Sequence, residues 1–393
     1  MPTIVGIGRS NKLDPYEAGK EALTDALRSL QGTRPDFVFI FTTDSYPPAE
    51  IVEIVRLHCG KAQIAGCCSA GVITSEGLFY DSLVIMAINS DQLKFYNLLA
   101  CDVINSPYTA GSEIVSNLFF RRGPKNTFYP ETLILFPEGF ECYNTELVKG
   151  AASVMGMNNY LVGGGSGDNL KFFKTYQIGE GKYDYQGVSA TLVSTNVPVA
   201  MSYAHGWTPL SPPLTITKAQ GRTIKEINGE PALTAYIDYF KDTDFYEDSR
   251  RENFPSFGMR FPIGLQEYDR YIIRDPWSAL EDGSIVCVSE VPSKSIIRIM
   301  QAKPEDLLTA AKKAATEIIQ ILGKKPAFAL VFNCISRALL LNEKAPDEIA
   351  IIREILGEDV PIAGFLTFGE IAGGMKASPA LHNKAIVIWA VSS

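Results

Sequence analysis

Residues 15–21 read "PYEAGKE", and 92 residues further along the chain residues 107–113 read "PYTAGSE", with five of the seven letters identical. A run with apolar residues at helical spacing follows each stretch, "ALTDALRSL" at 22–30 and "IVSNLFF" at 114–120. Two matching helix starts at this separation indicate that one structural unit is used more than once.

Each copy continues with the same order of elements. A β-rich apolar run comes first, followed by a helix, a short apolar run that ends in a glycine-bearing loop, and a closing strand. In the first copy these are residues 36–44, 47–60, 62–71 and 81–88, and in the second they are 131–139, 144–156, 159–168 and 187–194. A looser third copy begins with a helix at 303–323 and continues at 327–337, 345–357, 360–374 and 382–391.

This pattern predicts an α/β fold, bordering on α+β, built from repeated β-α-β-α-β units. Helices between strands imply crossover connections with parallel pairing, and short links to the closing strands imply antiparallel returns. We therefore expect mixed sheets flanked by helices. Residues 201–300 depart from the repeat, with a proline-rich link, "TPLSPP", near residue 210. We predict two domains, 1–210 with two internal repeats and 211–393 with a divergent insert and the third repeat.

Composition excludes several classes of function. The net charge is −8 and the pI about 5.2, which argues against nucleic acid as a partner. No apolar run is long enough to span a membrane, and no secretory signal is visible, so we expect a cytoplasmic protein without a membrane partner. Seven cysteines without a CxxC pair indicate free thiols, and three scattered histidines suggest neither a metal centre nor a cofactor.

The predicted strands end in polar and glycine-bearing loops, where ligands gather in crossover α/β units. The loop "GGGSGD" (163–168) has neither the lysine and hydroxyl of a P-loop nor a following helix, so tight turns explain it better than nucleotide binding. We expect the glycine-bearing turns of the three units to come together around a small polar ligand.

The loops of the third copy are the best candidate for that site. Arg337 ends the stretch 327–337, just past its apolar strand, and Glu370 ends the loop after the next strand. A guanidinium can clamp a carboxylate and a carboxylate can accept an ammonium, so together they could bind an amino acid. A buried structural ion pair is an equal alternative. The predicted ligand-binding residues are Asn333, Cys334, Ser336, Arg337, Phe365, Thr367, Glu370, His382 and Asn383; no catalytic or metal-ligating residue is assigned.

An enzymatic alternative uses Cys334 as a nucleophile with His382 as its base, in a hydrolase or transferase. A cysteine at the end of an apolar strand is more often a small buried side chain, and no GxSxG motif supports catalysis. A third alternative is a protein-interaction scaffold that binds no ligand.

Several stretches in a fixed order resemble the FIST proteins, which combine an N-terminal and a C-terminal FIST domain. They are "IAGCCSAGVI" (64–73), "YLVGGGSGDN" (160–169), "AHGWTPLSPP" (204–213) with its continuation to Tyr236, "RFPIGL" (260–265), "LVFNCISR" (330–337), "VPIAGFLTFGEIA" (360–372) and "LHNKAIVI" (381–388). The resemblance implies a stand-alone sensory protein that binds a small molecule, with amino acids proposed for the family, and signals through a separate protein partner. Self-association into a homo-oligomer stays open.

Overall fold

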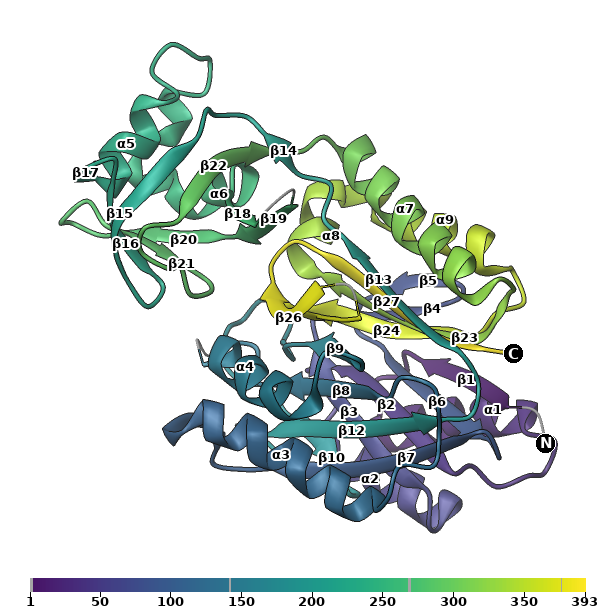
Figure 1. Cartoon of the computed structure of the whole chain (residues 1–393). Coiled ribbons are helices and arrows are strands. Elements are labelled where there is room, and N and C mark those ends of the chain that lie inside the picture. The colour runs from purple at the N-terminus through teal and green to yellow at the C-terminus, as the bar shows by residue number, and fades with distance from the viewer. Residues whose placement is uncertain (1–2, 141–142, 268–269, 376) are drawn as a thin grey trace. The chain divides into compact units, whose positions relative to one another are not determined.

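The computed structural model describes residues 3–140, 143–267, 270–375 and 377–393 (Figure 1). The chain forms two compact units. The first contains the chain up to Ala204 together with Ala310–Leu381 and Ala385–Ser393, and the second contains His205–Thr309 and His382–Lys384. The predicted division into two sequence domains at residue 210 stays a prediction. The compact units are a different division, because all three repeats contribute to the first unit.

Three repeats with a similar order of elements make up most of the first unit, and repeat 3 has one additional helix, α8. Repeat 1 is β1 (Ile4–Ser10), α1 (Pro15–Ser29), β2 (Phe37–Thr43), α2 (Pro48–Cys59), β3 (Gln63–Ser69), β4 (Val72–Thr74), β5 (Gly77–Phe79) and β6 (Leu83–Asn89). Repeat 2 is β7 (Leu93–Ala100), α3 (Pro107–Arg122), β8 (Thr132–Pro137), α4 (Asn144–Met155), β9 (Tyr160–Gly164), β10 (Gln177–Gly179), β11 (Lys182–Asp184) and β12 (Val188–Thr195). Repeat 3 is β13 (Val199–Ala204), α7 (Pro304–Leu322), β23 (Pro326–Cys334), α8 (Ile335–Leu341), α9 (Ala345–Leu356), β24 (Ile362–Thr367), β25 (Glu370–Gly374), β26 (Ala377–His382) and β27 (Ile386–Ser392).

The repeats exchange strands in a ring. Their sheets have the orders β1-β6-β2-β3-β10-β11, β7-β12-β8-β9-β25-β26 and β13-β27-β23-β24-β4-β5. The last two strands of each sheet come from another repeat: repeat 2 completes sheet 1, repeat 3 completes sheet 2, and repeat 1 completes sheet 3. Each sheet pairs two strands in parallel, β2 with β3, β8 with β9 and β23 with β24, and most other neighbours, such as β2 with β6, are antiparallel. The expected mixed α/β sheets are therefore confirmed.

One central core joins the three sheets. Phenylalanines at the same register position of β2, β8 and β23 lie within it, with ring centroids of Phe41 and Phe136 5.6 Å apart and those of Phe136 and Phe332 5.8 Å apart. Phe365 contacts all three rings at 5.1 to 5.6 Å. Because these aromatic side chains come from all three repeats, the core forms only when the three repeats are folded together.

A pair of helices covers the outer face of each sheet. In repeats 1 and 2, the repeated heptapeptide begins the first helix of the pair. Pro15 and Pro107 are the first residues of α1 and α3, where the missing proline N–H costs no hydrogen bond. The glycine of each heptapeptide faces the second helix: a Cβ on Gly19 would meet Ile54, and one on Gly111 would lie 2.1 Å from the carbonyl oxygen of Leu147. The heptapeptide thus marks a helix start and a close helix–helix contact in both repeats.

A glycine in the third strand of each repeat lies against the strand beside it. Gly66, Gly163 and Gly364 are paired with Ile40, Leu135 and Val331 in the parallel ladders. A Cβ at any of the three would lie 1.8 to 2.0 Å from the carbonyl oxygen of its partner, which is impossible without moving the strand.

The second unit is built around a nine-stranded antiparallel sheet and two short helices. Its elements are β14 (Thr208–Pro209), β15 (Leu214–Gln220), β16 (Thr223–Ile227), β17 (Glu230–Pro231), α5 (Ala232–Asp238), α6 (Phe254–Arg260), β18 (Ile263–Glu267), β19 (Arg270–Arg274), β20 (Pro276–Ala279), β21 (Ile285–Cys287) and β22 (Ile296–Gln301). Phe240 packs on Tyr236, Phe257 and Phe261 at 4.8 to 5.6 Å and anchors the two helices. Within the described residues, no helix has both the length and the apolar character needed to cross a bilayer.

Replacing Gly66 or Gly364 by alanine should lower the free energy of unfolding by more than about 4 kcal/mol, because the new methyl group would separate two paired strands. Gly19→Ala is the matched control. Its Cβ would meet most closely the flexible ends of Ile51 and Ile54, at 3.1 and 3.0 Å, so it should leave stability within about 1 kcal/mol of wild type. Urea denaturation measures both. A loss below about 1 kcal/mol at Gly66 would contradict the close approach.

Candidate ligand-binding site

The glycine-bearing loops of the three repeats meet at the carboxyl ends of the parallel strands. Backbone hydrogen bonds join them in pairs: Leu366 N to Gly71 O at 2.8 Å, Gly167 N to Cys68 O at 3.0 Å, and Gly165 N to Gly369 O at 2.8 Å. The loops pack directly on one another, since a Cβ on Gly167 would lie 2.1 Å from the ring of Phe368. The "GGGSGD" stretch therefore begins within β9, which ends at Gly164, and continues as a loop packed closely against its neighbours rather than as a set of tight turns.

The three repeats can be compared at one position. In each sheet, the residue that follows the third-strand glycine is paired with a residue on the strand from another repeat. These pairs are Phe365 with Val72, Cys67 with Gln177, and Gly164 with Glu370. Repeat 1 has a valine at this position, repeat 2 an amide and repeat 3 a carboxylic acid. All three side chains are fully buried.

Gln177 shows what this position requires for folding. Its Nε2 donates to the hydroxyl of Ser166 at 2.6 Å, and its Oε1 accepts from the backbone N–H of Gly187 at 2.9 Å. The amide thereby joins the turn after β9 to the start of β12.

Glu370 contacts the two corresponding groups in repeat 3, with both oxygens accepting, whereas Gln177 donates to Ser166 and also to Thr175 Oγ1 at 3.0 Å. Glu370 Oε1 accepts from the hydroxyl of Thr367 at 2.5 Å, and its Oε2 accepts from the backbone N–H of Ala385 at 2.9 Å. Thr367 and Ala385 occupy the register positions of Ser166 and Gly187 in repeat 2. A glutamine could accept from the Ala385 N–H and donate to the Thr367 hydroxyl, so an amide fits these two contacts.

Burial raises the pKa of Glu370 to about 7, because the ionised carboxylate loses its hydration. Hydrogen bonds from Thr367, from the Ala385 N–H and from the Cys334 thiol oppose this shift, and so does attraction to Arg337. Glu370 therefore changes its charge near neutral pH.

Arg337 lies at the carboxyl end of β23, on α8, and is paired with Glu348. Its Nε donates to Glu348 Oε1 at 3.1 Å and its Nη2 donates to the same oxygen. Asn333 Nδ2 donates to the other oxygen at 2.6 Å. Arg337 and Glu348 are both fully buried. Glu348 is not among the predicted site residues, although its position beside Ile349 and Ile352 on α9 places it on the apolar helix face that packs inward.

The other predicted site residues fall into two groups. Cys334 and Ser336 lie beside Arg337 and are buried, and Phe365 belongs to the central aromatic core. Asn333 keeps one buried polar atom, Oδ1, without a hydrogen-bond partner among the described residues. His382 and Asn383 are also buried but belong to the second compact unit.

The second unit contains a polar cluster that sequence analysis did not identify. Lys384 is fully buried, with its Nζ 3.0 Å from Asp275 Oδ2 and 5.3 Å from the ring centre of Trp207. Lys384 has a left-handed backbone, with φ of 60°. The only available signal was a lysine placed directly before the apolar strand "AIVIW", and a lysine there usually extends into solvent.

Cys334 does not have the surroundings of an exposed nucleophile. Its side chain is buried and its thiol hydrogen-bonds the Glu370 carboxyl. The six cysteines that the structure describes are free, and Cys142 lies outside the described residues. Among the described side chains, no group of three or more His, Cys, Asp or Glu is placed to hold a metal ion.

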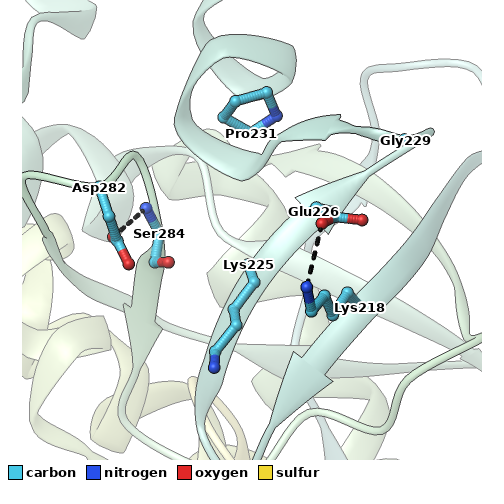
Figure 2. Close-up of a pocket in the computed structure, with 7 residues that line it drawn as sticks. All are labelled: Lys218, Lys225, Glu226, Gly229, Pro231, Asp282 and Ser284. Atoms are coloured by element: carbon cyan, nitrogen blue, oxygen red, sulfur yellow. Dashed lines mark hydrogen bonds and ion pairs between the residues drawn. The ribbon is translucent and has the colours of Figure 1, made fainter.

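Two open grooves are lined by other residues. One in the second unit has a volume of about 260 Å³ and is lined by Lys218, Lys225, Glu226, Gly229, Pro231, Asp282 and Ser284 (Figure 2). Figure 2 shows Lys218 pointing towards Glu226 on the neighbouring strand, where the two form a 3.4 Å ion pair. A second groove of about 400 Å³ runs along charged residues of α1. Both present ion-paired surface side chains, so we place the candidate site at Glu370.

The fold and this cluster define a triplicated α/β protein with a buried polar site at the carboxyl ends of its parallel strands. Family models match residues 36–230 as a FIST N domain and residues 232–373 as a FIST C domain. The chain therefore belongs to the FIST family, whose domains are sensory, and the resemblance in the sequence is confirmed.

Among its relatives, the uncharacterized protein Rv0628c of Mycobacterium tuberculosis is 23% identical over 405 residues, covering 96% of this chain and 97% of that protein. The uncharacterized protein MJ1623 of Methanocaldococcus jannaschii is 24% identical over 196 residues, covering 46% of this chain and 36% of that protein. Among solved structures, a cyanuric acid hydrolase from A. caulinodans aligns over the full length of both chains, with 8% identity and a TM-score of 0.39.

Arg337→Ala should lower the free energy of unfolding by about 3 to 5 kcal/mol, because it leaves the carboxylate of Glu348 buried without its cation. The double variant Arg337→Met/Glu348→Met removes both charges and should recover most of that loss. Urea denaturation of the two variants and wild type measures the difference. Equal losses in the single and double variants would show that the ion pair is not the cause.

Glu370→Gln should remove a pH dependence of stability. Between pH 4.5, the ordinary pKa of a glutamate, and about 7 the folded protein keeps a proton that the unfolded chain has lost, so the free energy of unfolding of wild type falls as the pH rises. The variant should therefore gain about 2.5 kcal/mol relative to wild type between pH 5 and pH 8. Urea denaturation at both pH values tests this. A difference that does not change with pH would contradict the raised pKa.

Proposed function

We propose that this protein is a sensor that binds a small polar metabolite, such as an amino acid, at the cluster of Asn333, Cys334, Arg337, Thr367 and Glu370. Ligand binding at this site is signalled to a separate protein partner. A cytoplasmic location fits the acidic composition and the free thiols.

The observation that carries this proposal is the carboxylic acid of Glu370 at a position where Gln177 shows that a neutral amide suffices. A fully buried acid costs stability whenever it ionises. Such a cost at a position that does not need an acid is typical of a functional group.

The surrounding charges favour a ligand that carries an amino group. An ionised Glu370 can accept an ammonium, and the neighbouring Arg337 provides a rigid set of N–H donors. Because Arg337 already forms an ion pair with Glu348, a ligand carboxylate would share the guanidinium with Glu348.

Thermal unfolding in the presence of single amino acids and small organic acids tests the proposal. A ligand at a hundred times its Kd stabilises the folded protein by about 2.7 kcal/mol, which should raise the Tm by about 5 °C. Glu370→Gln should fold normally and lose the shift, whereas Glu113→Gln, at an exposed position on α3, should keep it. A panel that leaves the Tm of wild type unchanged, or an equal shift in the Glu370 variant, would count against this site.

A further inference from the structure

We propose that an exposed aromatic surface beside the candidate site docks a separate protein, whose own docking face is apolar and carries a carboxylate at its border. This aromatic surface lies within the first unit and consists of Leu170, Phe172, Phe173, Lys174, Tyr185 and Phe368. That the docked protein receives the ligand signal rests on the proposed function, whereas the docking itself can be tested without a ligand.

Large apolar side chains of the aromatic surface are exposed to solvent. Phe173 is 85% exposed, Phe172 45% and Leu170 40%. The ring centroids of Phe172 and Phe368 lie 5.7 Å apart, so the link between β9 and β10 of repeat 2 meets the turn between β24 and β25 of repeat 3. A contiguous apolar surface of this kind marks a place where another molecule binds, because exposure of apolar groups to water is unfavourable.

The backbone holds these phenylalanines in one conformation. The carboxylate of Asp168 is buried and accepts hydrogen bonds from the backbone N–H groups of Lys171, Phe172 and Phe173 at 2.9 to 3.0 Å. Leu170 and Phe172 have left-handed backbones, with φ of 60° and 52°, although neither is glycine. A side chain that is fixed before association loses less conformational entropy on binding, so this loop is suited to docking.

The charges next to the rings indicate the chemistry of the partner. Lys171 is matched, because its Nζ lies 2.5 Å from Asp44 Oδ2 and Asp81 also attracts it. Lys174 is exposed and forms no ion pair among the residues that the structure describes. Its Nζ lies 3.4 Å from the ring centre of Tyr185. This cation beside the rings is therefore available to a carboxylate of the partner.

The same charges disfavour two other occupants. A second copy of the aromatic surface would bring no unmatched carboxylate to Lys174, since Asp44 and Asp81 face Lys171 and Asp168 is bonded to its own loop. An anionic membrane is bound by clusters of several basic side chains, whereas this surface offers Lys174 in a chain of net charge −8. A protein with an apolar, acid-bordered face fits best.

The aromatic surface shares a turn with the candidate site. Phe368 lies between Thr367, which hydrogen-bonds Glu370, and Gly369. Backbone hydrogen bonds hold this turn to Gly165 of repeat 2, from Phe368 N to Gly165 O at 2.9 Å and from Gly165 N to Gly369 O at 2.8 Å. A protein docked on Phe368 would contact the turn that lines the site, so ligand binding and partner binding can affect each other.

Site-specific photo-crosslinking in the full-length protein tests the docking. A benzophenone-bearing phenylalanine at position 173, added to a lysate of the cells that naturally contain the protein, should crosslink one protein distinct from this chain. The same substitution at Phe128, which is also fully exposed, is the matched control and should not crosslink that protein.

Binding measurements with the purified partner then identify the contacts. Phe173→Ser should raise the Kd about tenfold or more, whereas Phe128→Ser should leave it within about twofold. Lys174→Glu should raise the Kd about tenfold, and replacing the acid at the crosslinked site of the partner by lysine should restore binding. Circular dichroism melting shows whether each variant is folded.

Equal crosslinking at positions 173 and 128, or none at position 173, would overturn the docking surface. A crosslink to a second copy of this chain would do the same, as would Phe173-dependent sedimentation with vesicles of phosphatidylserine and phosphatidylcholine. Docking that no amino acid or organic acid strengthens or weakens would keep the surface and refute its link to the proposed site. A ligand that raises the Tm of a protein without a docking partner would keep the site and overturn the surface.

Discussion

The pairing of each repeat's short hairpin with the sheet of another repeat is the constraint on which the first unit depends. β10, β25 and β4 close the sheets of repeats 1, 2 and 3, and every one of these strands comes from a different repeat. Because no sheet is complete on its own, the three repeats must fold together, and the central aromatic core forms only in that assembly. The same exchange brings the three glycine-bearing loops together at one edge of the first unit.

Much of this architecture could be predicted because periodicity is local. The helix of 303–323 and the strands around Phe41, Phe136 and Phe332 have patterns that nothing nearby contradicts. The exchange of hairpins could not be predicted, since β4, β5, β10 and β11 are three residues long and a pattern needs more residues than that. The place of the third repeat beside the first two depends on these short pairings, and for that reason it was visible only in the structure.

The site shows the same division between local and distant information. Arg337 and Glu370 could be expected near each other, because both follow adjacent parallel strands at the edge where carboxyl ends meet. The partner of Arg337 is Glu348, eleven residues later on another helix, and the choice between Glu348 and Glu370 depends on side-chain directions that a strand pattern does not contain. Lys384 is a similar case, since its burial depends on Asp275, more than one hundred residues away.

Internal repetition supplies a comparison that a single-copy protein lacks. Val72, Gln177 and Glu370 occupy one register position in three nearly equal surroundings, so their differences separate what the fold requires from what it merely tolerates. Repeat 1 has an apolar side chain here and repeat 2 an amide, which contacts the groups that correspond to the two partners of the acid and also donates to Thr175. The acid adds only the ability to exchange a proton, at the cost of burying a group that ionises near neutral pH. A property that the scaffold does not need, present in one repeat out of three, identifies repeat 3 as the part of the molecule whose chemistry is specialised.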